Sequence, residues 1–253
     1  MVVRAEPGFM NCPVPDRQAL LLTVKTVISR PFLQAERYEY RVWFDPDDLD
    51  AIQRSRWRQG RDGWLKLYRW KEEGVERIKI KPAGDTKSSD PLTWKDRSSS
   101  FFHFPQTSTS CKTISDPVIL IYLSSILSER GWSESSPDDG RVHLCAFGKK
   151  QLHEVELLPS GDRQEPVGYT IYEGGRGPFK QIKRAGQVPI SIYRIETRAI
   201  VTPGTEPEAF SLLGLEGDIE IHVDRIFQVP VRLKGRNRLL GGITLTLQEI
   251  VLP

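Results

Sequence analysis

Apolar and polar residues alternate along most of this chain. In residues 217–224, Ile219, Ile221 and Val223 alternate with polar side chains, and residues 229–235 repeat the pattern. Successive side chains of a β-strand point to opposite faces, so this period of two predicts strands with one buried face. The pattern predicts roughly a dozen short strands, at residues 20–29, 36–44, 52–59, 64–70, 75–80, 141–147, 151–158, 167–172, 178–184, 190–200, 217–224, 229–235 and 241–252.

One segment departs from this period. Residues 115–132, "SDPVILIYLSSILSERGW", place their apolar side chains at helical spacing. Ser115 or Asp116 is expected to cap the helix, with Pro117 in its first position. The segment therefore predicts one α-helix at about 115–130 that packs on the sheet through an apolar stripe formed by Ile119, Leu120, Leu123, Ile126 and Leu127.

These elements predict a mainly β fold, which is a large curved antiparallel sheet or an open meander barrel with one α-helix. Residues 1–19 are expected to form an extended N-terminal segment. Residues 20–253 are expected to form a single β-rich domain, a length that one β domain often reaches. Residues 83–100, "AGDTKSSDPLTWKDRSSS", are polar and predict an exposed connection within it.

Composition narrows the function classes only slightly. The 253 residues are 38% hydrophobic and 27% charged, which suits a globular protein. Thirty-six basic and 33 acidic residues are spread along the chain, so there is no basic block and we expect no nucleic-acid partner. No run approaches the roughly 18 apolar residues of a transmembrane helix. The first residues lack the apolar core of a signal peptide, which leaves a cytoplasmic location open.

The three cysteines show no metal-binding spacing. Cys12 and Cys111 lie in loop-like contexts, whereas Cys145 lies in the apolar strand "VHLCAF". In an oxidising compartment we expect a structural disulfide between Cys12 and Cys111. The alternative is that the three cysteines are unrelated free thiols.

The hairpin at residues 52–70, "IQRSRWRQGRDGWLKLYRW", is the main candidate for a binding site. An even loop at "GRDG" would place Gln59 opposite Trp64, and Trp57 opposite Lys66. The aromatic side chains would then share one face and the arginines the other. One interpretation is an aromatic core face with a solvated arginine face. The other is a surface where rings supply apolar area and arginines bind a phosphate or carboxylate. The candidate ligand-binding residues are Trp57, Trp64, Tyr68 and Trp70 with Arg54, Arg56 and Arg58.

His143 and His153 flank Cys145 and raise the question of a metal site. A three-residue loop at residues 148–150 would bring Cys145 opposite His153, on the face of His143, whereas a two-residue loop would turn His153 away. With no fourth ligand evident, ordinary strand residues are the favoured interpretation, and neither a metal nor a cofactor is expected. Lys149 and Lys150 lie at the tip of this loop.

We find no G-x-S-x-G, H-E-x-x-H, Walker A or G-x-G-x-x-G motif, and therefore expect no enzymatic activity. A hydrolase of unrecognised type stays a further alternative, because two carboxylates from distant strands leave no local signature.

The C-terminal pattern "LLGLEGDIEIHVDRIFQVPVRLKGRNRLLGGITLTLQEIVL" resembles the end of an uncharacterised family of exported bacterial β-proteins, a domain of unknown function. The resemblance extends to "SDPVILIYLSSIL", "CAFGKKQLHEVEL" and "YRVWFDPDDLDAIQRSRWRQGRDGWLKLYRW". It implies a curved antiparallel sheet or calycin-like barrel in the periplasm or cell envelope, and no catalytic motif comes with it.

The resemblance and the clustered aromatic residues together lead us to expect a non-enzymatic cell-envelope protein. It would bind an apolar or amphipathic, lipid-like ligand on a concave sheet face. The alternative is a structural or assembly protein that docks an envelope protein through a sheet edge or the Arg-rich face. The oligomeric state is left open.

Overall fold

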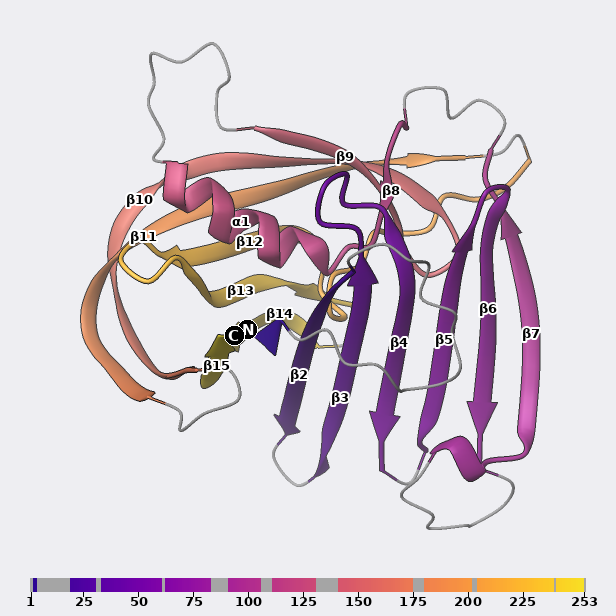
Figure 1. Ribbon diagram of the computed structural model, residues 1–253, viewed down its shortest axis with the longest axis horizontal. Helices are drawn as coiled ribbons and strands as arrows, with labels where there is room; N and C mark the ends of the chain where they lie inside the picture. Colours follow the sequence, from indigo (N-terminus) through magenta and orange to yellow (C-terminus); the bar gives the residue numbers. More distant parts are fainter. Residues whose placement is uncertain are drawn as a thin grey trace. The chain divides into compact units, whose positions relative to one another are not determined.

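The computed structural model describes residues 2–3, 19–30, 33–60, 62–82, 91–105, 111–130, 141–174, 180–201, 204–238 and 240–252 (Figure 1). The chain divides into two compact units, and each is considered by itself. The N-terminal unit is Val3–Phe104, and the C-terminal unit is Pro105–Pro253 with Met1–Val2. The strands expected in a single domain are thus shared between two units. Most of the expected segment 1–19, including Cys12, lies outside the described residues.

The N-terminal unit is one antiparallel sheet whose strands lie in chain order (Figure 1). Its strands are β1 (Val2–Val3), β2 (Leu20–Arg30), β3 (Leu33–Phe44), β4 (Ala51–Gln59), β5 (Trp64–Lys71), β6 (Gly74–Lys81) and β7 (Asp96–His103). Gly74 follows the turn after β5, where a Cβ atom would stand 2.2 Å from the carbonyl oxygen of Phe102. Only glycine permits this approach of β6 to β7.

The segment 83–100, which its polar composition predicts to be an exposed connection, contains a short 3-10 helix and most of a β-strand. Residues 83–90 lie outside the described residues, but η1 (Pro91–Thr93) and β7 follow directly. Trp94, between them, is buried against Leu65, Leu67 and Ile80. Strand β7 is mostly exposed and pairs with β6 along its whole length, so its serines occupy an edge strand.

The C-terminal unit is an eight-stranded sheet in the order β14-β13-β12-β11-β10-β9-β8, with β15 beside β10. Its strands are β8 (Ile114–Ser115), β9 (Val142–Phe147), β10 (Leu152–Glu173), β11 (Lys180–Ile200), β12 (Glu216–Asp224), β13 (Val229–Asn237), β14 (Gly241–Thr246) and β15 (Glu249–Leu252). The sequence predicts two strands in place of β10 and two in place of β11. Instead β10 continues through "PSGDRQEP", because a bulge between Pro159 and Gly161 absorbs the apparent turn.

The segment that joins β14 to β15 links β13 to β10. Leu247 donates its backbone N–H to Val231, while Thr170 donates to Gln248, so one short segment bonds to both β13 and β10. The long strands β10 and β11 therefore curve around an apolar core (Figure 1). Its buried members are Tyr169, Ile171, Val188, Ile190, Ile192, Val229, Val231 and Ile250.

The helix α1 (Ile119–Arg130) is the one α-helix among the described residues, and it packs on β12 and β13. Asp116 caps its start, since Oδ1 accepts a hydrogen bond from the Val118 N–H at 2.9 Å. The predicted fold class, mainly β with curved antiparallel sheet structure and one helix, is confirmed, and the strands form two sheets where one was expected. In the described part of the chain, no helix has the length and apolarity needed to cross a membrane.

Cys111 forms a disulfide with Cys145 on β9, with a Cα–Cα distance of 5.5 Å. A cysteine can form one disulfide, so the predicted pairing of Cys111 with Cys12 is wrong. The prediction treated Cys145 as a buried strand residue. The parallel pairing of β8 with β9, which puts Ile114 beside Cys145, is the long-range contact that brings Cys111 to it.

Candidate functional site

The hairpin of β4 and β5 has a register one residue away from the predicted one. Trp57 lies opposite Leu65, and Arg58 lies opposite Trp64. Since a shift of one residue exchanges the faces of a strand, the predicted separation of aromatic residues from arginines is wrong. The arginines and most of the rings share one face, while Trp57 lies on the other.

We call the shared face the cation face. It runs over four neighbouring strands of the N-terminal unit, β3 to β6, whose pairing places its members side by side. Sequence reasoning included six of these residues and missed Tyr38, Tyr40, Lys66, Arg77 and Lys79. Alternation along β3, β5 and β6, combined with the correct hairpin register, would have found them. The members are Tyr38, Tyr40, Arg54, Arg56, Arg58, Trp64, Lys66, Tyr68, Trp70, Arg77 and Lys79.

Guanidinium groups and rings interleave on the cation face. The Arg56 Cζ atom lies 5.0 Å from the ring centre of Trp64 and 5.1 Å from that of Tyr40. The Lys66 Nζ atom lies 4.4 Å from the Trp64 ring, and the Arg54 Cζ atom lies 3.9 Å from the Tyr68 ring. Each such contact contributes about 0.5–1 kcal/mol at an exposed site. The rings therefore hold the cations in place without neutralising them.

Three cations form a row across adjacent strands. Arg56 lies opposite Lys66, and Lys66 lies opposite Lys79. The Cβ atoms of directly opposite residues are about 5 Å apart, and like charges in these positions are destabilising. The described residues place no carboxylate within ion-pair distance of Arg56 or Lys66. Arg58, at the end of this face, is paired with Glu36 at 3.4 Å.

The ionisation of Lys66 reflects this environment. Burial, together with the nearby charges of Arg56, Lys79, Arg77 and Arg54, lowers the pKa of Lys66 to about 8. Burial and the charges of neighbouring cations also lower the pKa of Lys79, against the opposing effect of Asp96. An anion bound beside Lys66 would favour its charged form.

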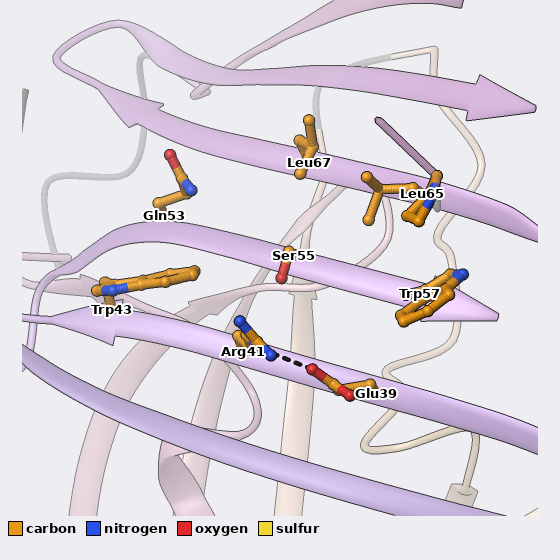
Figure 2. A pocket seen from close by; sticks show the side chains of 9 residues that line it. Glu39, Arg41, Trp43, Gln53, Ser55, Trp57, Leu65 and Leu67 are labelled. Carbon is orange, nitrogen blue, oxygen red and sulfur yellow. Dashed lines mark hydrogen bonds and ion pairs between the residues drawn. The ribbon is translucent and has the colours of Figure 1, made fainter. Parts of the chain in front are cut away.

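The opposite face of the same sheet contains a hollow (Figure 2). Trp43 and Trp57 lie at opposite ends of the view, with the ion pair of Arg41 and Glu39 between them at 2.6 Å. The cavity volume is about 30 Å³, which holds about two water molecules and no lipid chain. Trp57 packs against the buried core of this face, so its role here is structural.

The C-terminal unit holds a second polar cluster, around Glu165. His222 is fully buried and its Nδ1 lies 2.9 Å from Glu165 Oε1, while Arg163 and Arg232 both form ion pairs with the same carboxylate. Burial alone would raise the pKa of Glu165, but the hydrogen bonds with His222 and Arg163 outweigh it and lower the pKa. Every charge in this cluster has a partner.

Asp224, at the end of β12, holds the turn into β13. Its Oδ2 accepts hydrogen bonds from the Tyr169 hydroxyl at 2.8 Å and from Arg184 at 3.3 Å, and its Oδ1 accepts from the Ile226 N–H. Burial and the bond to Asp224 raise the pKa of Tyr169. These hydrogen bonds indicate that Asp224 and Tyr169 stabilise the turn between β12 and β13.

The two histidines and Cys145 are not brought together. His153 is buried and lies opposite Ala146. The loop at residues 148–151 is even, so it turns His153 away from the face of Cys145, as the two-residue alternative predicted. Burial lowers the pKa of His153 to about 4, and its ring contacts Phe210. His143 is exposed, and Cys145 is in the disulfide. Lys149 and Lys150, at the loop tip, pair with Glu216 and Glu208.

A scan against protein-family models, a search of curated proteins and a search of solved structures each returned no match. The assignment of function therefore depends on the geometry of the two clusters and on the resemblance described above.

Proposed function

We propose that this is a non-enzymatic cell-envelope protein that binds an amphipathic anion on the cation face of its N-terminal unit. The observation that carries the proposal is the direct pairing of Arg56 with Lys66 beside the Trp64 ring, with no carboxylate partner among the described residues. The rings supply apolar area for a hydrocarbon chain, and the cations attract the charged head group.

Two further observations support this face over the opposite one. The hollow between Trp43 and Trp57 is too small for a lipid-like ligand, and its central charges already neutralise each other. On the cation face, Trp64, Lys66 and Trp70 are each half-buried, so their side chains keep part of their surface open. The predicted ligand-binding set therefore loses Trp57 and gains Lys66.

The disulfide supports the proposed location. Disulfides persist in oxidising compartments such as the bacterial periplasm and are rare in the cytosol. The location is tested by directing the protein for export and digesting it without reductant. A peptide linked through Cys111 and Cys145 is expected from the exported protein, and free thiols at both positions would contradict this part of the proposal.

Binding is tested with soluble ten-carbon amphiphiles and a matched pair of tryptophan variants. Decanoate and decyl phosphate supply anionic head groups, and decyl maltoside supplies an uncharged one. We expect the anionic compounds to bind to the wild-type protein, and Trp64→Phe to weaken that binding. Trp57→Phe, in the same hairpin but on the opposite face, is expected to leave it unchanged.

Failure of both anionic compounds to bind, at concentrations below their micelle thresholds, would overturn the proposal. The alternative would then be favoured, in which the Arg-rich face or the edge strand β7 docks an envelope protein. Equal weakening by Trp57→Phe and Trp64→Phe would also contradict the assignment, because it would indicate a general effect on the fold.

A further inference from the structure

We propose that the cation face is a phosphate site, centred on Lys66 and completed by Arg56, Arg77 and Lys79. This inference rests on the proposed function and specifies its ligand class as a phosphate monoester that carries an apolar chain. Its basis is the placement of four cations on three adjacent strands, β4, β5 and β6, with rings on either side of them.

The geometry of the row sets the position of the anion. Arg56 and Lys79 flank Lys66 from the two neighbouring strands, and Arg77 lies diagonally from Lys66, opposite Tyr68. Adjacent strands are about 4.8 Å apart, so an anion above Lys66 is within reach of the long side chains on both sides. Arg77 is oriented by Ser100, whose hydroxyl accepts a hydrogen bond from Nη2 at 3.1 Å.

The arginines retain unused hydrogen-bonding capacity. The Nε atoms of Arg56 and Arg77 are buried without a hydrogen-bond partner in the described part of the protein. Leaving such donors unsatisfied is unfavourable, and a bound oxyanion could draw the two side chains into bonded orientations. A guanidinium group binds phosphate in a forked geometry, and Lys66 adds a point charge between the two forks.

Charge and acceptor number favour phosphate over carboxylate. A carboxylate carries one negative charge, whereas a phosphate monoester carries about −1.5 to −2 at neutral pH and offers three acceptor oxygens. Four neighbouring cations match the second group better. A multiply charged ligand would also stabilise the charged form of Lys66 most, because the charged groups that shift its pKa include four cations and no carboxylate.

The rings define where the rest of the ligand lies. Tyr38 and Trp64 flank the row on one side. On the other side Tyr68 is buried beneath Arg54, and the half-buried Trp70 lies further along the same strand. A head group held at Lys66 would therefore place an attached chain over the partly exposed Trp64 ring. This arrangement distinguishes a lipid-like phosphate from a free phosphate ion, which would make no use of the rings.

The experiment measures binding of four probes by calorimetry at equal ionic strength: inorganic phosphate, decyl phosphate, decanoate and an oligothymidylate. We expect decyl phosphate to bind about tenfold or more tightly than decanoate, a difference of the size given by one charge-assisted hydrogen bond. Inorganic phosphate is expected to bind weakly and to compete with decyl phosphate. Lys66→Met and Arg56→Gln should each weaken decyl phosphate about tenfold, and Lys95→Met, at an exposed position in the same unit, should not.

Each contrary outcome has a separate meaning. Equal affinity for decanoate and decyl phosphate would overturn the phosphate assignment and leave the proposed function standing. Absence of binding to all four probes would overturn both. Inorganic phosphate that binds as tightly as decyl phosphate would retain the phosphate site but contradict the amphipathic ligand. Binding of the oligothymidylate alone would replace both with a single-stranded nucleic-acid surface. Because Lys66→Met is expected to be more stable than wild type, its loss of binding would not arise from unfolding.

Discussion

The two units hold clusters of arginines that differ in their counter-charges. Around Glu165, Arg163 and Arg232 share a buried carboxylate, which also contacts His222. Around Lys66, Arg56 and Lys79 lie directly opposite it on the two neighbouring strands, and the described residues give Lys66 no carboxylate partner. The first cluster neutralises itself, and the second has no such counter-charge among the described residues.

This difference is the basis for the structural role that we assign to the first cluster and for the binding role that we propose for the second. Removing one partner of a buried, hydrogen-bonded ion pair destabilises the fold, because it leaves an uncompensated charge. A row of like charges opposes folding, because the cations repel one another at cross-strand distance. The two clusters are therefore expected to respond to charge removal with opposite signs.

The largest effect is expected for Glu165→Gln. Removing this charge leaves Arg163, Arg232 and His222 without their shared partner, so we expect the free energy of unfolding to fall by about 3 kcal/mol. Urea denaturation measures the change. Glu196→Gln, in the exposed pair with Arg194, is the matched control and should cost about 0.5 kcal/mol or less. Equal losses in the two variants would contradict a structural role for Glu165.

Lys66→Met is expected to act in the opposite direction. The variant removes the central charge of the row and keeps an apolar side chain of similar length, so we expect a gain of about 1 kcal/mol in the absence of anions. Lys95→Met, at an exposed position, should change the stability by less than about 0.5 kcal/mol. A clear loss of stability in Lys66→Met would show that the cation row supports the fold, which would favour the core interpretation of this face.

The two clusters are expected to change the free energy of unfolding over different pH ranges. The pKa of Lys66 is about 8 in the folded protein and 10.5 as its ordinary value, so the unfolded chain binds more protons between these values. Stability should therefore rise from pH 8 towards 10.5 by on the order of 1 kcal/mol, after allowance for solvent screening. The same scan of Lys66→Met should show a smaller rise, since the lowered pKa of Lys79 remains. A rise of equal size in both proteins would assign it to groups other than Lys66.

Glu165 is expected to affect the free energy of unfolding at acid pH. Its folded pKa lies below the ordinary value of 4.5, so its contribution is present above 4.5 and is lost as the pH falls through the folded pKa. The difference in unfolding free energy between wild type and Glu165→Gln should therefore shrink on acidification. A difference that stays constant down to the acid transition would contradict the ion-pair account.

The smallest effect is expected from salt. Added sodium chloride screens the repulsion between half-exposed cations, so wild-type stability should rise by a few tenths of a kcal/mol between low and high salt. Lys66→Met should show less of this rise, which differential scanning at a series of salt concentrations can measure. An equal rise in both proteins would assign the effect to other charges.

Much of the fold was predictable because its determinants are local. Alternation of apolar residues indicated most of the strands, and the Asp116-Pro117 pair with the following apolar residues indicated α1. The errors arose where long-range pairing decides the outcome. The bulge at Pro159–Gly161 hides the continuity of β10, and the parallel contact of β8 with β9 selects Cys145 over Cys12 as the partner of Cys111.

The candidate site was predictable in composition but not in geometry. The hairpin sequence identified Arg54, Arg56 and Trp64, yet a register shift of one residue exchanged the face of Trp57 and united the arginines with the rings. The same shift places Lys66 on the face of the arginines. The Glu165 cluster had no sequence signal, because Glu165 and His222 are 57 residues apart and meet only through the curvature of the sheet.

The most direct test is an NMR titration of the Lys66 side chain in protein labelled with ¹³C-lysine, with and without decyl phosphate at equal ionic strength. Lys66→Met assigns the resonance. A pKa near 8 without ligand that moves towards 10.5 with decyl phosphate would support an anion bound at the centre of the row. An unchanged pKa in the presence of saturating decyl phosphate would contradict the account.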